Sequence, residues 1–273
     1  MKKLVSIIST SILLLTTFTL ANRKPASESL IVNIDPSVSA ECSIPEDQLG
    51  DNASFAQFTN YAVQNLNTTF RNPNPDIKPT EVKSIEIVFE SGFRPQLTES
   101  DSKEPGTYKI YLSYPKNDTR VWWQLGHELG HLINPTAIHP FAEGFASAFG
   151  FQITKKCGVP NEKWLGFIRE QTPTTYGATY RLFKDVADVV DPRILVRFFT
   201  EPEFQNLHGA LDMNLWLNAE SNFTTAKRRQ VFNILDWRYK AVYSLREEYS
   251  FNGQEFKFEP IKNNDTNQTL EFR

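Results

Sequence analysis

Residues 121–134 read Val-Trp-Trp-Gln-Leu-Gly-His-Glu-Leu-Gly-His-Leu-Ile-Asn, and this stretch places two histidines four positions apart. Residues at that spacing stack on one face of a helix, so His127 and His131 can direct both imidazoles at one metal ion. Glu128 lies about 100° further round the helix, where its carboxylate can reach a water molecule beside that ion. The stretch therefore predicts a metal site with an adjacent carboxylate base.

The apolar flanks of this motif favour a metal over the alternative, two solvent-facing histidines on an ordinary helix. Tryptophan, leucine and isoleucine surround the polar residues, so we expect the helix over 119–134 to be buried on most faces. Buried imidazoles and carboxylates need partners, and a metal ion supplies them. Gly126 and Gly130 each cost a helix interior about 1 kcal/mol relative to alanine. That cost predicts the close approach of another backbone.

A third metal ligand is expected from the next helix, over 140–155. Pro140 suits its first turn, which places Glu143 one turn inside. Small residues share the face of Glu143 and would let this helix press against the two glycines: Ala146, Ser147 and Gly150. His139 is the alternative third ligand, although its place before Pro140 also suits a capping or surface residue.

These elements resemble the gluzincin metallopeptidases, the group that includes thermolysin-like enzymes and zinc aminopeptidases. The resemblance rests on His127-Glu-Leu-Gly-His131 followed by Glu143-Gly-Phe-Ala, and it is strong over about 107–155 and faint elsewhere. It implies that His127, His131 and Glu143 hold one zinc ion and that Glu128 is the catalytic base. The interval from His131 to Glu143 is shorter than in the best-known members, which keeps the His139 alternative open.

The resemblance also implies a tyrosine on a following helix that stabilises the oxyanion. Tyr176, at the expected start of a helix over 175–190, is the first candidate, and Tyr180 is the second. The alternative is that both tyrosines only pack. In such enzymes the strand before the zinc helix lies at the sheet edge and pairs with an extended substrate, a position that residues 107–114 would occupy.

The pattern of apolar residues predicts an α+β fold. Residues 84–90 and 107–114 alternate apolar and polar side chains as half-buried strands do, and helical patterns follow almost to the end of the chain. Helices are expected first over 53–66 and, after the strands, over 119–134, 140–155, 161–169, 175–190, 193–200 and 223–249. We expect a small N-terminal sheet packed on the metal-site helix and a mostly helical C-terminal lobe, the zincin-like arrangement that the resemblance implies.

The N-terminus predicts export. Lys2 and Lys3 precede an apolar run over 4–20, and the small Ala21 follows, a pattern typical of a signal peptide over 1–21; an uncleaved anchor is the alternative. Residues 22–50 are polar and contain prolines, so we expect a linker or loosely docked arm. The catalytic domain is expected over 51–258 and a polar tail over 259–273. The mature protein would be secreted, periplasmic or extracellular, with no membrane segment.

Composition and cysteine content narrow the function further. A net charge of −3 gives no electrostatic case for binding nucleic acid. The two cysteines, Cys42 and Cys157, are expected to form a disulfide in an oxidising compartment, with two free thiols as the alternative.

The sequence therefore predicts a secreted zinc metallohydrolase, most simply a peptidase acting on peptide or protein substrates. A secreted zinc-binding or surface-binding protein that keeps this fold without proteolysis is the alternative.

Overall fold

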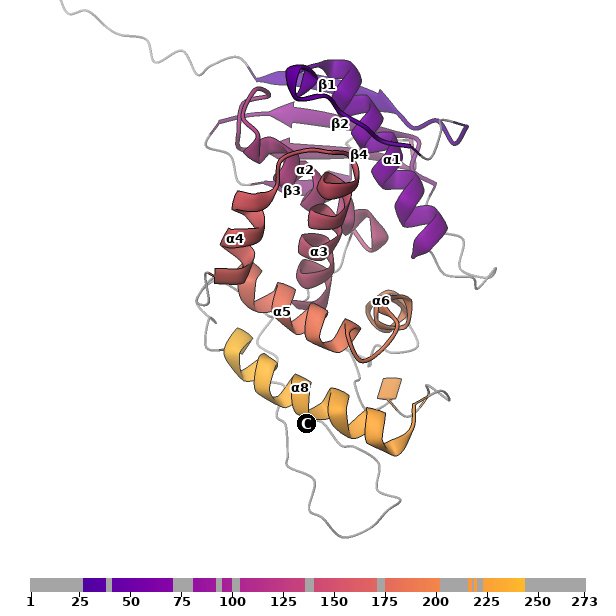
Figure 1. Cartoon of the computed structure of the whole chain (residues 1–273). Coiled ribbons are helices and arrows are strands. Elements are labelled where there is room, and N and C mark those ends of the chain that lie inside the picture. Colours follow the sequence, from indigo (N-terminus) through magenta and orange to yellow (C-terminus); the bar gives the residue numbers. More distant parts are fainter. Residues whose placement is uncertain are drawn as a thin grey trace, which may run out of the picture.

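A computed structural model of the chain describes residues 27–37, 41–70, 81–91, 95–99, 104–135, 140–170, 175–201, 216, 217, 219 and 223–243. The expected signal peptide over 1–21, the tail over 259–273 and His139 lie outside these ranges. Within them, the sheet lies at one end of the molecule and helix α8 at the other (Figure 1). No helix in these ranges is both long and apolar enough to span a lipid bilayer.

The sheet has four strands in the order β1-β2-β4-β3. They are β1 (Glu28–Asn33), β2 (Ser84–Phe89), β3 (Gln96–Glu99) and β4 (Thr107–Leu112). The central pair β2 and β4 is parallel, whereas β1 and β3 run antiparallel to their neighbours. In β4 the buried side chains alternate with half-buried ones, as the sequence pattern predicts. The α+β prediction is confirmed by this small mixed sheet and the helices that follow it.

Residues 22–50 do not form only a linker or loosely docked arm, because part of this stretch is strand β1. The strand pairs with β2 from Glu28 to Asn33, and its Val32 side chain is buried. Ile31, on the opposite face, is 67% exposed. A six-residue edge strand with polar neighbours carries too little apolar pattern to be recognised in the sequence.

Residues 107–114 were expected to form the sheet edge, and this prediction is wrong. Strand β4 is flanked on both sides, by β2 and by β3, which pairs with it from Gln96 to Glu99. The outer position on this side of the sheet belongs to β3. The sequence pattern describes burial of a strand's faces, and it carries no information on which strands lie beside it.

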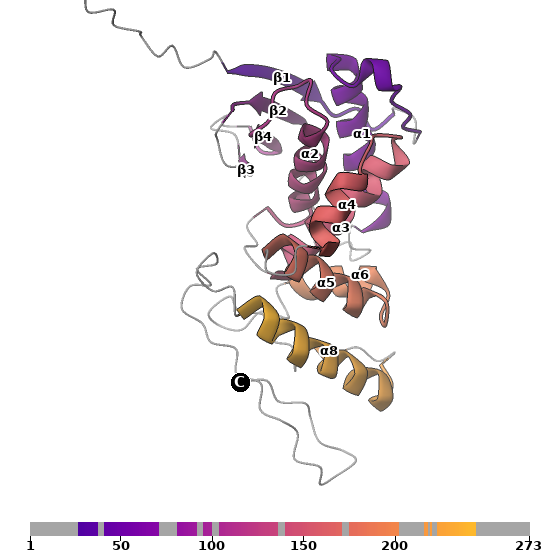
Figure 2. The same cartoon turned by 60° about the vertical axis from the view of Figure 1, so that its left-hand side comes forward.

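The helices follow the predicted order, with boundaries shifted by a few residues. Before the strands of the central pair come the short η1 (Glu46–Gln48) and α1 (Asn52–Thr69). After them come α2 (Arg120–Gly130), η2 (His131–Ile133), α3 (Pro140–Lys156), α4 (Glu162–Glu170), α5 (Thr175–Ala187), α6 (Pro192–Thr200) and α8 (Thr225–Tyr243). Helix α2 lies between the sheet and α3, and α5 lies between α3 and α8 (Figures 1 and 2).

Aromatic packing holds α2 against α1 and the sheet. Trp122 is fully buried and stacks on Phe55 of α1, with ring centroids 4.0 Å apart. Phe89 of β2 meets the same Phe55 ring edge-on at 5.1 Å, and Phe58 meets Trp122 edge-on at 5.2 Å. Aromatic pairs of this kind bury large areas in a restricted geometry. The position of α2 is therefore set by its apolar face.

Hydrogen bonds set the start of α2. The Arg120 N–H donates to Asp118 Oδ1 at 2.9 Å, so the Asp118 side chain satisfies the first N–H group of the helix. Hydrogen bonds from Arg120 also lower the pKa of Asp118. Gln124 connects α2 to the end of β4, since it accepts from the Ser113 N–H at 2.9 Å and donates to Ser113 Oγ at 2.5 Å. These two hydrogen bonds fix the start of α2 to the end of β4.

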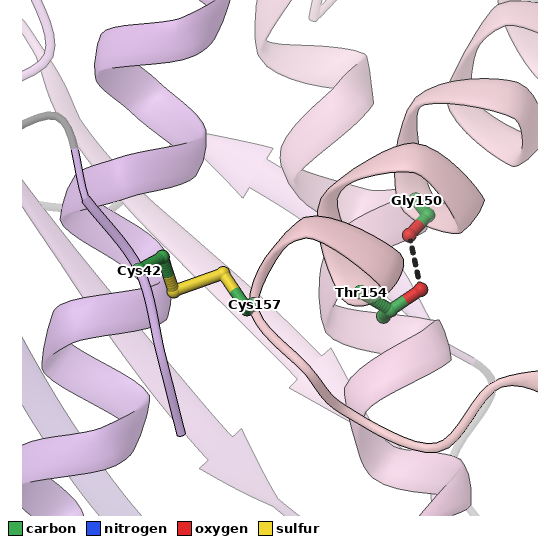
Figure 3. The surroundings of a disulfide bond; sticks show 4 residues. All are labelled: Cys42, Gly150, Thr154 and Cys157. Carbon is green, nitrogen blue, oxygen red and sulfur yellow. Dashed lines mark hydrogen bonds between the residues drawn. A yellow bond between two sulfur atoms is a disulfide. The ribbon is translucent and has the colours of Figure 1, made fainter.

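The predicted disulfide is present and joins Cys42 to Cys157. Figure 3 shows it between the segment that precedes η1 and the C-terminal end of α3, close to Gly150 and Thr154. A backbone hydrogen bond from Ile44 N to Cys157 O, at 2.9 Å, accompanies the bridge. Disulfides persist in oxidising compartments, so the bond fits an extracellular protein.

Candidate metal centre

Three side chains, one each from α2, η2 and α3, converge at the C-terminal end of α2. His127 Nε2 lies 3.1 Å from His131 Nε2 and 3.2 Å from Glu143 Oε2. His131 Nε2 lies 3.7 Å from Glu143 Oε1. The His127 side chain is 6% exposed, and those of His131 and Glu143 are 14% and 18% exposed. The structure therefore brings together the three residues predicted as ligands.

The spacing of these donor atoms suits a metal ion. Zinc bonds of about 2.0–2.1 Å in tetrahedral geometry separate neighbouring donor atoms by about 3.3 Å. The His127–His131 and His127–Glu143 separations, 3.1 and 3.2 Å, are close to that value, and the 3.7 Å contact of His131 ends on the other oxygen of the Glu143 carboxylate. One donor atom from each of the three residues lies within 4.8 Å of the other two. Two imidazoles and one carboxylate, moreover, leave a fourth position free for a water or substrate. The group is a candidate divalent-metal site with an open coordination position.

The ligands meet because α2 and α3 cross with their backbones nearly in contact. A Cβ added at Gly126 would lie 2.9 Å from Gly150 Cα, and one added at Gly130 would lie 2.7 Å from Ala146 Cα. Both distances are shorter than side-chain packing allows. The close approach predicted from the glycines is confirmed, and it is what carries Glu143, on α3, to the two histidines on α2 and η2.

We predict that Gly130→Ala destabilises the fold and weakens metal binding. The new methyl group would overlap Ala146 and push the helices apart, at a cost of about 1–3 kcal/mol in the free energy of unfolding. Gly166→Ala on α4 is the matched control, because a Cβ there meets nothing within 4 Å; it should stabilise by up to about 1 kcal/mol. Urea unfolding and zinc titration measure both effects. Equal outcomes for the two variants would contradict this account.

Burial and nearby carboxylates act in opposite directions on the two histidines. Burial lowers the pKa of His127, but the hydrogen bond and charge of Glu143, with the charge of Glu128, outweigh it and raise the pKa overall. For His131, burial and the charge of His127 outweigh the attraction of Glu143, and the pKa falls to about 4. His131 is therefore a neutral imidazole near neutral pH, the form that binds metal.

The Ser147 hydroxyl contacts the His127 ring at the nitrogen that does not face the other candidate ligands. Its fully buried hydroxyl oxygen lies 3.3 Å from His127 Nδ1, on the side of the ring away from Glu143. When Nδ1 donates its proton to this oxygen, Nε2 carries the lone pair that faces the other ligands. The sequence analysis places Ser147 on the contact face of α3, but only as a small residue. Its spacing of four from Glu143 is the signal for this second role.

We predict that Ser147→Ala lowers zinc affinity by about 10- to 100-fold, because the His127 ring loses the group that orients it. Ser54→Ala on α1 is the control, since Ser54 is also a buried serine but lies on a different helix. Competition titration with a zinc-binding dye measures the affinity. An unchanged affinity in Ser147→Ala would mean that the serine only fills space.

Glu128 is buried beside the three ligands and is 5% exposed. It lies on α2 immediately after His127, and its charge is close enough to raise the pKa of that histidine. A buried carboxylate next to a metal site is suited to accept a proton from water.

Tyr176, in the first turn of α5, is the tyrosine that lies against the site. Its ring meets the His127 imidazole edge-on, with centroids 5.4 Å apart and an interplanar angle of 84°. Tyr180, the second candidate, lies one turn further along α5 and is 5% exposed. Gly144 lets α5 approach α3, because a Cβ at that position would meet Thr179 O at 2.2 Å.

Comparisons with known proteins add no relative. No protein-family profile matches the chain, and neither a search of curated proteins nor one of solved structures finds a match. The site must therefore be interpreted from its own chemistry.

Metal titration separates the two candidates for the third ligand. We predict that the protein binds one zinc ion per chain and that His131→Gln or Glu143→Gln each lowers the affinity by more than about 100-fold. His139→Gln should bind zinc as the wild type does. Elemental analysis gives the stoichiometry, and dye competition gives the affinity. Loss of zinc in His139→Gln, with binding intact in Glu143→Gln, would make His139 the ligand.

Proposed function

We propose that the protein is a zinc-dependent hydrolase of the zincin type that cleaves peptide bonds. The observation that carries the proposal is the convergence of His127, His131 and Glu143, whose donor atoms lie within 4.8 Å of one another, with Glu128 buried on the same helix. Histidines and a glutamate form catalytic zinc sites when a coordination position stays open. A purely structural site would need no carboxylate base alongside.

Each residue of the site has a separate task in this mechanism. His127, His131 and Glu143 would hold the zinc ion, which would supply Lewis-acid chemistry by acidifying water and polarising a carbonyl oxygen. Glu128 accepts a proton from the attacking water as the new carbon–oxygen bond forms. The same carboxyl group then delivers that proton to the departing nitrogen as the carbon–nitrogen bond breaks. The Tyr176 hydroxyl donates a hydrogen bond to the carbonyl oxygen as it gains negative charge.

The outer strand of the sheet is a feature that favours a peptide as the substrate. Strand β3 pairs with β4 on one side, and within the described residues its other side adjoins no further strand. The same strand contacts α2, the helix that carries His127 and Glu128. An extended peptide can add to an exposed strand edge through backbone hydrogen bonds.

The compartment forms part of the proposal. The Cys42–Cys157 disulfide supports a protein that works outside the cytoplasm, in agreement with the export signal predicted over 1–21. We therefore propose a secreted peptidase.

We predict that Glu128→Gln lowers kcat by about 10²- to 10⁴-fold and leaves zinc stoichiometry and affinity unchanged, because the amide cannot accept the proton. Glu46→Gln, an exposed position on η1, is the control and should keep full activity. Digestion of a peptide library by the zinc-loaded proteins measures turnover.

Three results would count against the mechanism. Full activity in Glu128→Gln would exclude that residue as the base. Zinc bound by the wild type without cleavage of any peptide would favour the non-proteolytic binding protein. Iron as the metal that copurifies would point to oxygen chemistry, since two histidines and a carboxylate also suit non-haem iron.

A further inference from the structure

An aromatic cluster from three helices adjoins the candidate metal centre. Trp123 of α2, Trp164 of α4 and Tyr176 of α5 form a continuous chain of ring contacts that ends on His127. Trp123 and Trp164 stack with centroids 5.7 Å apart and planes 22° apart. Trp164 and Tyr176 lie 6.5 Å apart at 57°. The rings of Trp164 and Tyr176 therefore meet at an open angle, one ring contact away from a metal ligand.

The cluster is fixed to the same face of α2 that carries the ligands. Trp123 precedes His127 by four residues, so both side chains lie on one side of the helix. The Trp123 indole N–H donates to Pro160 O at 3.0 Å, which ties this ring to the segment just before α4. Trp164 stacks on the Trp123 ring, which this hydrogen bond holds in place. The position of Trp164 relative to the metal centre is thus set by the fold.

Exposure separates this cluster from the aromatic core. Trp122 and Trp216 are fully buried, as expected of side chains that only fill the interior. Trp164 and Tyr176, in contrast, are only partly buried. Large aromatic rings that keep exposed area beside a reaction centre are available to contact a ligand.

We propose that Trp164 and Tyr176 together select an aromatic side chain on the substrate residue next to the bond that is cleaved. The inference rests on the proposed peptidase function and names its substrate preference. Two rings at an open angle allow a third ring to stack on one and meet the other edge-on, the geometry that aromatic groups prefer. Tyr176 links the metal centre to the proposed aromatic subsite, because the same side chain contacts His127 and Trp164.

The test compares peptides that carry phenylalanine, alanine or aspartate next to the scissile bond and are otherwise identical. The substitution is made in turn on each side of the bond, in peptides with free ends and in peptides with blocked ends. The zinc-loaded wild type should cleave the phenylalanine peptide with a kcat/KM about 10- to 100-fold above that of the alanine peptide. In Trp164→Ala the kcat/KM for the phenylalanine peptide should be no more than about threefold above that for the alanine peptide. Trp164→Phe should retain most of the wild-type ratio. Lys163→Ala, an exposed neighbour on α4, is the control and should keep the wild-type ratio.

A binding measurement separates this inference from the proposed function. Calorimetry with Glu128→Gln should give a Kd for the phenylalanine peptide about tenfold below that for the alanine peptide. Adding Trp164→Phe should preserve this difference, and adding Trp164→Ala should remove it. A selective Kd without any hydrolysis by the wild type would overturn the peptidase and keep the aromatic subsite. Hydrolysis with an unchanged preference in Trp164→Ala, or a preference for aspartate, would overturn the subsite and keep the peptidase.

Discussion

The three candidate ligands lie on helical segments whose backbones come closer than ordinary side-chain packing allows. Donor atoms around one zinc ion lie about 3.3 Å apart. Because the side chain of a glutamate is short, it can bridge only a small distance between two helices. In this protein Gly126 faces Gly150 and Gly130 faces Ala146, so α2 and α3 touch almost backbone to backbone. Everything that we assign to the site depends on this crossing.

The crossing has a cost that the surrounding core must offset. Each glycine weakens its helix by about 1 kcal/mol, and a short helix such as α2 gains little stability from its own hydrogen bonds. The stabilisation comes instead from the other face of α2, where Trp122 packs against Phe55 and Phe58. One face of the helix therefore packs in the core, and the other carries the candidate metal ligand His127. That division explains why apolar residues surround the histidines so closely.

The parts of the fold and site that were predictable from the sequence are those with a regular spacing. Histidines four apart, small residues on the Glu143 face and alternation in β4 each reflect a helix or strand period. The disulfide followed from there being two cysteines.

What could not be predicted depends on contacts between distant segments. Strands β1 and β3 are short edge strands, and their places in the sheet are set by pairing rather than by pattern. Trp164 reaches the site only because α4 and α5 pack together and α5 crosses α3 at Gly144. No spacing within the chain encodes that arrangement.

The disulfide divides the chain into residues inside a covalent ring and residues outside it. Cys42 and Cys157 are 115 residues apart, and the covalent ring that they close contains α1, three strands of the sheet and all of α2 and α3. His127, His131 and Glu143 all lie inside this ring, whereas α4 and α5, with Trp164 and Tyr176, follow it in the chain. A cross-link of this kind stabilises mainly by restricting the unfolded chain inside the ring that it closes. The bond therefore acts on the same stretch of chain that brings the three candidate metal ligands together.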